Sequence, residues 1–255
     1  MSGPSSTSAG GSGSARLETE TRHQFREELL GIEASALGGL DMVIEGLDRA
    51  TAALDSQDIG LAAAVIRDDD RIDGRYLEVH EAILSLIARE APVATDLRTA
   101  AAILHTIRHV ERMGDQCVNI CKLIPLSGHE PPVREEILTR IDEMSRLLHV
   151  QIVDAKRCFA TRDLTLAEEI ARGDGEINRL NREIFRIALE VGNDFDTREW
   201  AMHMMLVARC LERIGDNAVD ICEQVAFVVT GLFREFSDAS HPDSGRTSQT
   251  ASSGS

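Results

Sequence analysis

Two short acidic segments carry the residues of this chain that are best suited to chemistry. The segment ERMGDQCVNIC occupies residues 111–121 and returns as ERIGDNAVDIC at residues 212–222, with seven of eleven positions identical. On a helix, the acids and amides of each copy form one ridge, where like charges cost a few tenths of a kcal/mol unless something neutralises them. A solvated ridge and a set of cation ligands both fit this pattern. The residues at four-residue spacing are Glu111, Asp115 and Asn119, then Glu212, Asp216 and Asp220.

A second pair of polar residues recurs at a spacing of 105. The segment IRDDDRID, which ends at Asp73, aligns with ARGDGEIN, which ends at Asn178. The two pairs are therefore Asp69 with Asp73 and Asp174 with Asn178. Asp69 falls on the apolar side of its predicted helix, where an isolated carboxylate needs a partner because burying a lone charge is very costly.

The partner of Asp69 has two interpretations. In one, Arg71 or Arg112 forms a salt bridge with it. In the other, the acidic pairs of the two segments face one another across a groove between helices and hold a cation. A ligand set made of oxygens alone suits Mg, Mn or Fe. Gly114 and Gly215 lie between the acids of each ridge, where a glycine costs a helix about 1 kcal/mol of stability relative to Ala. Their expected use is the close approach of a neighbouring helix, which serves either packing alone or the meeting of two ligand sets.

Six helices are expected to position these residues. Apolar residues recur at spacings of three and four, and Asp and Pro residues mark the helix starts. Three helices joined by short loops bury their apolar stripes as a bundle, so the chain is expected to be all-α, with two tandem antiparallel three-helix bundles related by internal duplication. The expected helices span about residues 21–54, 58–89, 92–125, 133–160, 163–191 and 197–233. The repeats span residues 21–126 and 133–234, between Ser/Gly-rich disordered tails at 1–20 and 237–255.

Composition and charge narrow the function classes. Hydrophobic residues make up 43% of the 255 positions and aromatic residues only 4%, which favours helices around a sizeable core. Forty-three acidic residues against 27 Lys and Arg give a net charge of −16, which repels nucleic acids and anionic lipid surfaces. No apolar run approaches the roughly 20 residues of a membrane span, and the five cysteines suit packing in a reducing cytoplasm. A soluble cytoplasmic protein is therefore expected.

The duplicated motif resembles that of a known family. E-R-[IM]-G-D-x-x-V-[ND]-I occurs twice, APVATDLR at residues 91–98 opens the third expected helix, and VVTG occupies residues 228–231. These segments are similar to those of the PhoU family of phosphate-signalling proteins, and the resemblance covers about residues 21–234. It implies a pair of symmetrical three-helix bundles, often assembled as a homodimer.

The resemblance also implies a function. Members of the family act as negative regulators of phosphate uptake and of phosphate-starvation signalling, and they link a phosphate ABC transporter to a membrane sensor kinase. The implied protein is cytoplasmic and reaches the inner face of the membrane through these partners.

Some members of the family bind clusters of metal ions through paired E(D)-x-x-x-D(N) motifs. For this chain, the resemblance implies Fe, Mn, Mg or Zn at two sites, of which the second is poorer in charge because Asn178 is neutral. Gln116 and Asn217 stand where many relatives carry His after Gly-Asp. The implied ligands are Asp69, Asp73, Glu111 and Asp115 in the first repeat and Asp174, Asn178, Glu212 and Asp216 in the second, with Asn119 and Asp220 as weaker candidates.

Two alternatives to the phosphate-signalling adaptor remain open at this point. One is a PhoU-like accessory of another phosphate transporter or of a tolerance pathway, built on the same scaffold. The other is a helical-bundle enzyme that uses carboxylate-bound metal. The sequence offers no nucleophile, no general base with an orienting partner and no repeated Glu-x-x-His pair, so we expect no enzymatic activity.

Overall fold

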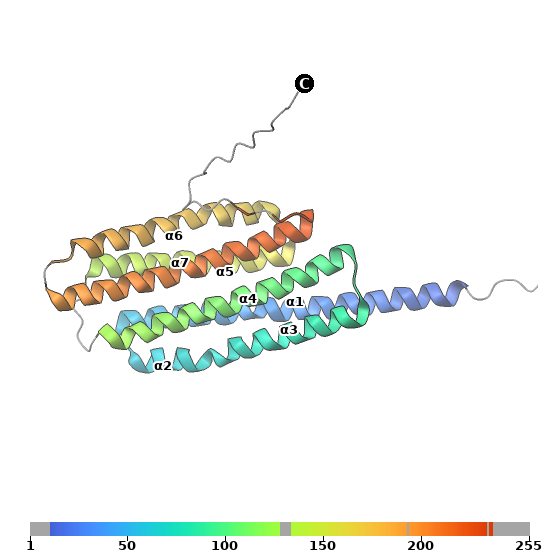
Figure 1. Cartoon of the computed structure of the whole chain (residues 1–255), viewed down its shortest axis with the longest axis horizontal. Helices are drawn as coiled ribbons and strands as arrows, with labels where there is room; N and C mark the ends of the chain where they lie inside the picture. Colours follow the sequence, from blue (N-terminus) through green and yellow to red (C-terminus); the bar gives the residue numbers. More distant parts are fainter. Residues whose placement is uncertain (1–10, 128–133, 193, 234, 237–255) are drawn as a thin grey trace, which may run out of the picture.

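The computed structural model is all-helical, as the sequence predicts (Figure 1). It describes residues 11–127, 134–192, 194–233 and 235–236. The first repeat comprises α1 to α4 with the 3-10 turn η1, and the second comprises α5 to α7. The helices are α1 (Gly11–Ser56), α2 (Ile59–Asp68), α3 (Asp70–Glu90), α4 (Ala94–Leu123), η1 (Ile124–Ser127), α5 (Glu135–Thr161), α6 (Leu164–Glu190) and α7 (Phe195–Thr230).

Capping aspartates fix where the second helix of each repeat starts. The Asp58 carboxylate accepts the backbone N–H of Leu61 at 2.9 Å, and the Asp163 carboxylate accepts that of Leu166 at 3.1 Å. Each bond satisfies one of the backbone donors that a helix start leaves without an intrahelical partner. The two caps are 105 residues apart, so the duplication seen in the sequence extends to the local structure of both repeats.

Two helix boundaries differ from those predicted. Helix α1 begins at Gly11 and so includes residues 11–20, which composition had assigned to the N-terminal tail; Ala, Arg, Leu and Glu in this stretch are good helix formers. The helix expected over residues 58–89 is divided at Asp69 into α2 and α3. Asp69 is the middle of three consecutive Asp residues, a type that favours caps over helix interiors. Residues 1–10 of the predicted N-terminal tail, residues 128–132 of the expected connection between the repeats and the predicted tail at 237–255 lie outside the described residues.

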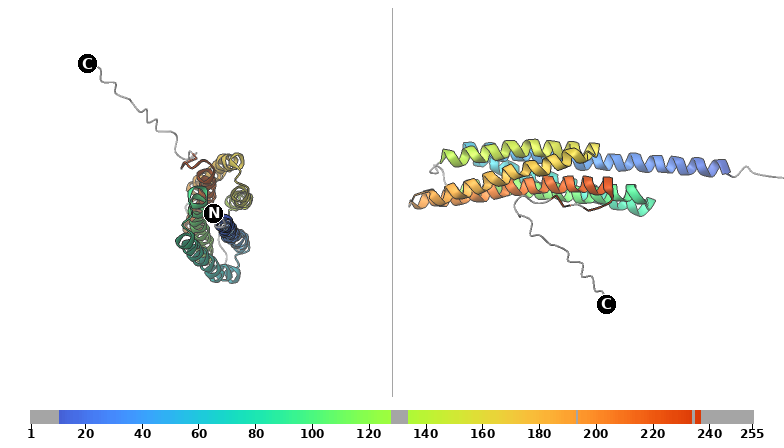
Figure 2. Two further views of the ribbon diagram at one scale, coloured as in Figure 1. Left: turned by 90° about the vertical axis from the view of Figure 1, so that its right-hand side faces the viewer. Right: turned by 90° about the horizontal axis from the view of Figure 1, so that it is seen from above.

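The two repeats pack side by side along their length (Figure 2). Helices α1 and α4 of the first repeat contact α5 and α7 of the second, while α2 and α3 lie on one outer side and α6 on the other. Buried apolar side chains of both repeats belong to one cluster, which includes Leu40, Ile103, Leu148 and Trp200. The acidic ridges on α4 and α7 are thus carried by two of the four helices that join the repeats.

Candidate functional site

Asp69 lies at the break between α2 and α3 and points its carboxylate at α4. Its Oδ1 atom is 2.9 Å from the position that a Cβ atom on Gly114 would occupy, and Ile72 approaches the same position equally closely. Any larger residue at 114 would therefore force these side chains to move. The glycine between the two acids of the first ridge allows a carboxylate from the neighbouring segment to lie directly against the helix.

Burial and neighbouring acids keep Asp69 from ionising at its ordinary pKa. Burial is the largest cause, and the charges of Asp73, Asp115 and Glu111 add to it, so that the pKa of Asp69 rises to about 6. The four carboxylates of the predicted first site thus lie within electrostatic range of one another. Their mutual repulsion is the physical condition that a bound cation would relieve.

The salt bridge considered for Asp69 is not formed in this structure. Arg71 instead approaches Glu45 on α1, with 4.0 Å between the charged atoms. Among the described residues, neither Arg71 nor Arg112 makes an ion pair with Asp69, and no hydrogen bond to its side chain caps α3. Asp69 is therefore a half-buried acid without a cationic side chain of its own.

Glu111 is the second acid of this site that is withdrawn from solvent. Burial raises the pKa of Glu111, against the opposing effect of Arg108, whose Nη1 atom lies 3.5 Å from Oε1. The other carboxylate oxygen, Oε2, is buried and has no hydrogen-bond partner among the described residues. A buried oxygen of this kind calls for a further donor or cation, because leaving it unpaired costs about 1–3 kcal/mol.

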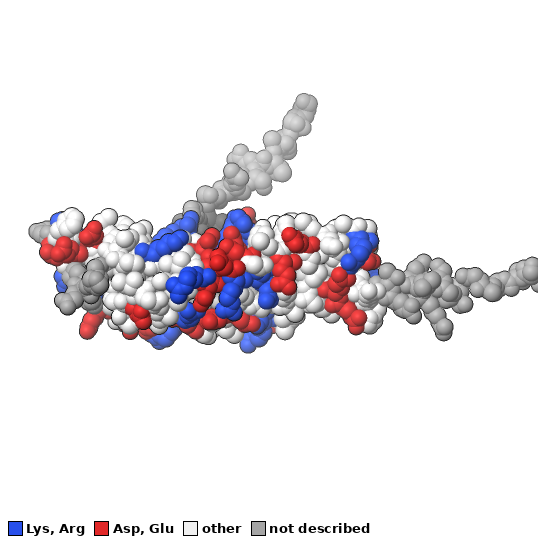
Figure 3. All heavy atoms as spheres, turned by 90° about the horizontal axis from the view of Figure 1, so that it is seen from below, with Lys and Arg blue, Asp and Glu red and all other residues white. Residues whose placement is uncertain are grey.

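The remaining predicted ligands of the first repeat face solvent. Asp73, Asp115 and Asn119 are all exposed. Acidic side chains gather near the middle of the face on which α2 and α3 lie, with Lys and Arg side chains between them (Figure 3). Within the described part of the chain, no three His, Cys, Asp or Glu side chains converge closely enough to hold a metal ion. The predicted ligands are thus neighbours whose side chains are not in ligating geometry.

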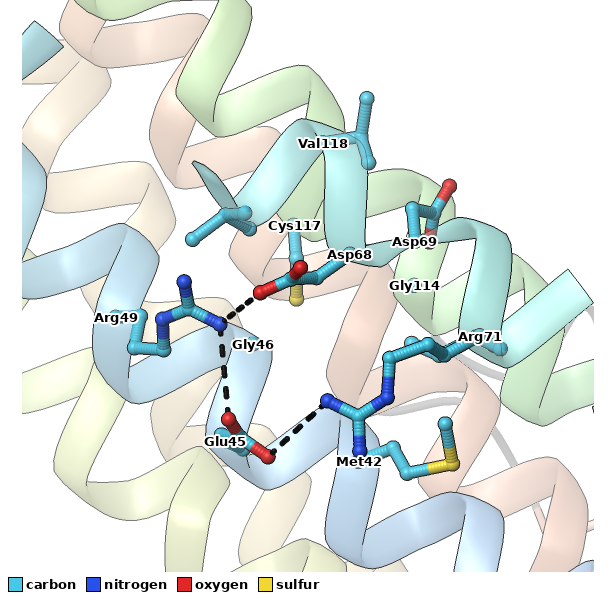
Figure 4. Close-up of a pocket in the computed structure, with 12 residues that line it drawn as sticks. Met42, Glu45, Gly46, Arg49, Asp68, Asp69, Arg71, Gly114, Cys117 and Val118 are labelled. Carbon is cyan, nitrogen blue, oxygen red and sulfur yellow. Dashed lines mark hydrogen bonds and ion pairs between the residues drawn. The ribbon is translucent and has the colours of Figure 1, made fainter. Parts of the chain in front are cut away.

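A small cavity borders Asp69 on its α1 side (Figure 4). It has a volume of about 20 Å³ and is lined by Gly46, Gly114 and Cys117, among others. This is room for roughly one water molecule or a small ion. Beside it, Arg49 on α1 donates to Asp68 at 2.5 Å. Asp68 is therefore neutralised within the chain, whereas Asp69, the next residue, is not.

The corresponding carboxylate of the second repeat is satisfied by amides. Gln151 on α5 donates to Asp174 Oδ1 at 3.1 Å, and Asn178 donates to Oδ2 at 2.7 Å. Asp174 and Asn178 are 7% and 2% exposed, so these bonds lie inside the protein. Asp174 Oδ1 also lies 2.8 Å from the position of a Cβ on Gly215, which repeats the relationship between Asp69 and Gly114.

The other predicted residues of the second repeat have mixed settings. Glu212 is buried and forms an ion pair with Arg209 one turn earlier, while Asp216 is exposed. Asp220 approaches His109 of α4, with 3.4 Å between carboxylate and ring nitrogen. His109 also hydrogen-bonds Asn217 at 2.8 Å, so this weaker candidate belongs to the contact between α4 and α7.

The two repeats therefore differ in how well they fit a cation. The first offers four carboxylates and a raised pKa at Asp69. The second has its central carboxylate, Asp174, already bonded to two amides. At the spacing of 105, Gln151 corresponds to Gly46, which borders the small cavity of the first repeat. An amide in the second repeat thus occupies the position that remains open in the first.

Sequence reasoning missed two features of these sites. Arg108 and Arg209 each precede the glutamate of their ridge by three residues and act as its counter-ion. They are 101 residues apart, so extending the motif alignment by one turn would have found them. The exchange of Gly46 for Gln151 follows from the 105 spacing in the same way, but its importance depends on which side of α1 and α5 faces the acids.

Comparisons with known proteins were consistent across family, sequence and structure. The model of the PhoU domain family matches residues 40–124 and again residues 141–225, one match in each repeat. The phosphate-specific transport system accessory protein PhoU homolog 1 of Thermotoga maritima is 32% identical over 209 residues, covering 81% of this chain and 89% of the relative. The PhoU homolog of Zymomonas mobilis is 34% identical, covering 81% of this chain and 87% of the relative.

Two solved structures share the fold. The phosphate transport system regulatory protein PhoU from Streptococcus pneumoniae superposes with a TM-score of 0.77 at 26% identity, covering 83% of this chain and 99% of the other. PhoU from Pseudomonas aeruginosa gives a TM-score of 0.74 at 27% identity, covering 82% and 100%. Within the described residues of this chain, no helix combines the length and the apolar character needed to cross a membrane.

Proposed function

The chain belongs to the PhoU family, and from this membership we propose that it is a negative regulator of phosphate uptake and phosphate-starvation signalling. The family consists of accessory and regulatory proteins of phosphate transport, and the chain is not an enzyme. The single observation that carries the proposal is the match of both repeats to the family, including the duplicated acidic ridges on α4 and α7.

We propose that the protein acts as an adaptor between a phosphate ABC transporter and a membrane sensor kinase. The relatives from Thermotoga maritima and Zymomonas mobilis are named as accessory proteins of phosphate-specific transport, which supports the transporter as one partner. The adaptor would lie in the cytoplasm, as a homodimer, and reach the inner face of the membrane through its partners. Its net charge of −16 favours docking to basic protein surfaces over direct binding to anionic lipids.

We further propose that the first repeat binds a cation, Fe, Mn, Mg or Zn, in support of this adaptor role. Asp69 and Glu111 would hold it from the buried side, and Asp73 and Asp115 from the solvent side, after rotation of their side chains. The support is the unneutralised charge at Asp69 and the unpaired oxygen of Glu111. When bound, the cation would supply positive charge and reduce the repulsion among the carboxylates of the ridge. The ridge would then be a less strongly charged docking surface.

A reporter assay tests the regulatory proposal. A phosphate-starvation promoter drives the reporter in wild-type, deletion and complemented strains grown at high phosphate. We expect the deletion strain to express the reporter and the complemented strain to repress it. Asp115→Lys should impair repression while the purified variant keeps its thermal stability, and Glu81→Lys, the same charge change at an exposed site on α3, should repress normally.

The same assay separates the proposal from its nearest alternative. Normal repression in the deletion strain, in the absence of a second copy of the gene, would refute the proposed role in starvation signalling. The protein would then be assigned as the accessory of another phosphate transporter or tolerance pathway.

A further inference from the structure

Helices α1 and α5 run antiparallel along the boundary between the two repeats and are joined by a series of acid–base pairs. In each pair, α1 supplies the carboxylate, and α5 or the residue that caps its C-terminal end supplies the basic side chain. The distances between the charged atoms are 2.5, 2.6 and 3.0 Å, in the order in which the pairs follow one another along α1. The pairs are Glu33 with Arg162, Asp41 with Lys156 and Asp48 with His149.

The series of pairs stops near the C-terminal end of α1. One turn beyond Asp48, the contact is between two hydroxyls, Thr51 and Ser145, at 2.8 Å. One turn further, Asp55 is exposed and has no basic side chain as an ion-pair partner among the described residues. The boundary between the repeats is therefore closed by charge pairs at one end and left open at the other.

A groove of about 590 Å³ occupies this open end. We call it the α1–α5 groove; most of the surface that it exposes is apolar. Leu54 and Ile141 are buried beneath it, Leu138 is half-buried, and Val150 is 58% exposed at its edge. Its volume falls in the range of ligand pockets, and the apolar surface it exposes to water gives a partner something to bury.

Carboxylates surround the apolar floor of the groove. Asp48, Asp55 and Asp142 all line it. The basic residues beside them are already engaged, since Arg146 pairs with Asp142 at 3.1 Å and His149 with Asp48 at 3.0 Å. Three carboxylates outnumber these two basic side chains, so the groove carries net negative charge around an apolar centre. An occupant that complements it has the opposite character, namely basic groups beside an apolar surface.

We propose that the α1–α5 groove docks an amphipathic, basic helix of a partner protein. The apolar side of that helix would cover Leu138 and Val150, and a Lys or Arg beside it would pair with Asp55. The incoming base would continue along α1 the series of pairs that α5 supplies at the other end. This assignment rests on the proposed adaptor function and specifies the kind of segment that the adaptor receives.

A binding assay with a defined probe tests the groove directly. The probe is a labelled synthetic helix of about 16 residues with Leu on one face and Lys on the other, and its twin carries Glu in place of every Lys. Fluorescence anisotropy with the full-length protein should show saturable one-to-one binding of the Lys peptide in the micromolar range. The Glu peptide should not bind, because like charges would meet at the groove.

Paired variants locate the binding. Ala52→Trp blocks the groove from an exposed position on α1, and Ala160→Trp places the same bulk at the far end of α5. Asp55→Lys and Glu81→Lys make the same charge change inside and outside the groove. We expect Ala52→Trp and Asp55→Lys to weaken binding at least about tenfold and the two controls less than about twofold. Melting curves by circular dichroism verify that each variant is folded.

Three results would overturn the proposal. One is equal binding of the Lys peptide by groove variants and controls, which would indicate general attraction to an acidic protein. Another is absence of saturable binding by the wild-type protein. The third is a change of the monomer–dimer equilibrium by Ala52→Trp in sedimentation, which would assign the groove to a second copy of this chain.

The cell assay distinguishes failure of the groove from failure of the proposed function. If the deletion strain loses repression and Ala52→Trp restores it fully, the regulatory function stands and the groove assignment is refuted. If the deletion strain represses normally, the regulatory function fails while the peptide measurements still decide what the groove binds. Loss of repression by Ala52→Trp together with normal repression by Ala160→Trp supports both the regulatory function and the groove assignment.

Discussion

Asp69 Oδ1 lies 2.9 Å from the point where a Cβ on Gly114 would stand, and Asp174 Oδ1 lies 2.8 Å from the same point on Gly215. In both repeats, a carboxylate at the second helical segment is accommodated by a glycine in the motif helix. A glycine inside a helix costs about 1 kcal/mol relative to Ala, so its presence at this contact in both copies is explained by the carboxylate that needs the space.

Gly114→Ala should therefore displace Asp69. We expect the variant to lose about 1–3 kcal/mol of stability from overpacking, reduced by the better helix propensity of Ala, and to bind cations more weakly. Gly74→Ala, on α3 with nothing within 4 Å of the added methyl, should instead be neutral or stabilising by up to about 1 kcal/mol. Chemical denaturation of the two variants measures the difference. Equal stabilisation by both would show that the contact at Gly114 is easily relaxed.

Cation binding should be tighter in the first repeat than in the second. Asp69→Asn removes a ligand that no basic side chain neutralises, so the affinity for the cation should fall at least about tenfold. Asp174→Asn should mainly lower the stability of the protein, because it disturbs the hydrogen bonds to Gln151 and Asn178. Calorimetry and elemental analysis on chelator-treated protein measure both effects. If the wild-type protein showed no saturable binding of Mg, Mn, Fe or Zn, the cation proposal would be abandoned.

Much of the fold follows from the sequence because the duplication fixes it twice. Asp at the start of the second helix of each repeat was predicted as a cap from its residue type, and the backbone hydrogen bonds of Asp58 and Asp163 confirm it. The N-terminal boundary was predicted from Ser/Gly-rich composition, yet α1 continues back to Gly11 through residues of good helix propensity. The break at Asp69 also escaped prediction, because the apolar periodicity runs through it without interruption.

The sequence predicts which acidic residues form the site but not which side chains neutralise them. Spacing placed Asp69 near the ridge at Glu111, and the charge of Glu111 is among the causes that raise the pKa of Asp69. Spacing could not decide what neutralises each carboxylate, because that depends on the exact reach of long side chains. Arg71, a candidate partner of Asp69, approaches Glu45 instead, and Gln151 supplies to Asp174 the bond that Gly46 cannot supply to Asp69.

Gln151→Ala should destabilise the second repeat. It removes the donor to Asp174 Oδ1 and leaves a buried carboxylate with one bond fewer, so we expect a loss of about 1–3 kcal/mol. Gln116→Ala on α4 is a matched control, since Gln116 makes no hydrogen bond within the described residues, and its effect should be under about 0.5 kcal/mol. Urea denaturation compares the two. A cost at Gln151 no larger than that at Gln116 would contradict the structural role given to the amide.

The raised pKa of Asp69 predicts a pH dependence of stability whose sign can be worked out. Its pKa is about 6 in the folded protein against an ordinary value of 3.8, so between about pH 4 and 6 the folded state holds more protons than the unfolded chain. The free energy of unfolding should therefore decrease as the pH rises through this window. Because Asp69 is partly exposed, the decrease should be on the order of 1 kcal/mol.

Asp69→Asn isolates this contribution, because the amide does not titrate. With chelator present, the free energy of unfolding of the wild-type protein minus that of the variant should fall between about pH 4 and 6 and stay level above it. Denaturation at several pH values gives this difference curve. A curve that rises with pH would mean that Asp69 is stabilised as a carboxylate by a partner side chain. Adding the proposed cation near pH 7 should restore the stability that the wild-type protein loses and leave the stability of Asp69→Asn unchanged. Ligand binding to the folded state raises stability only where the binding site exists.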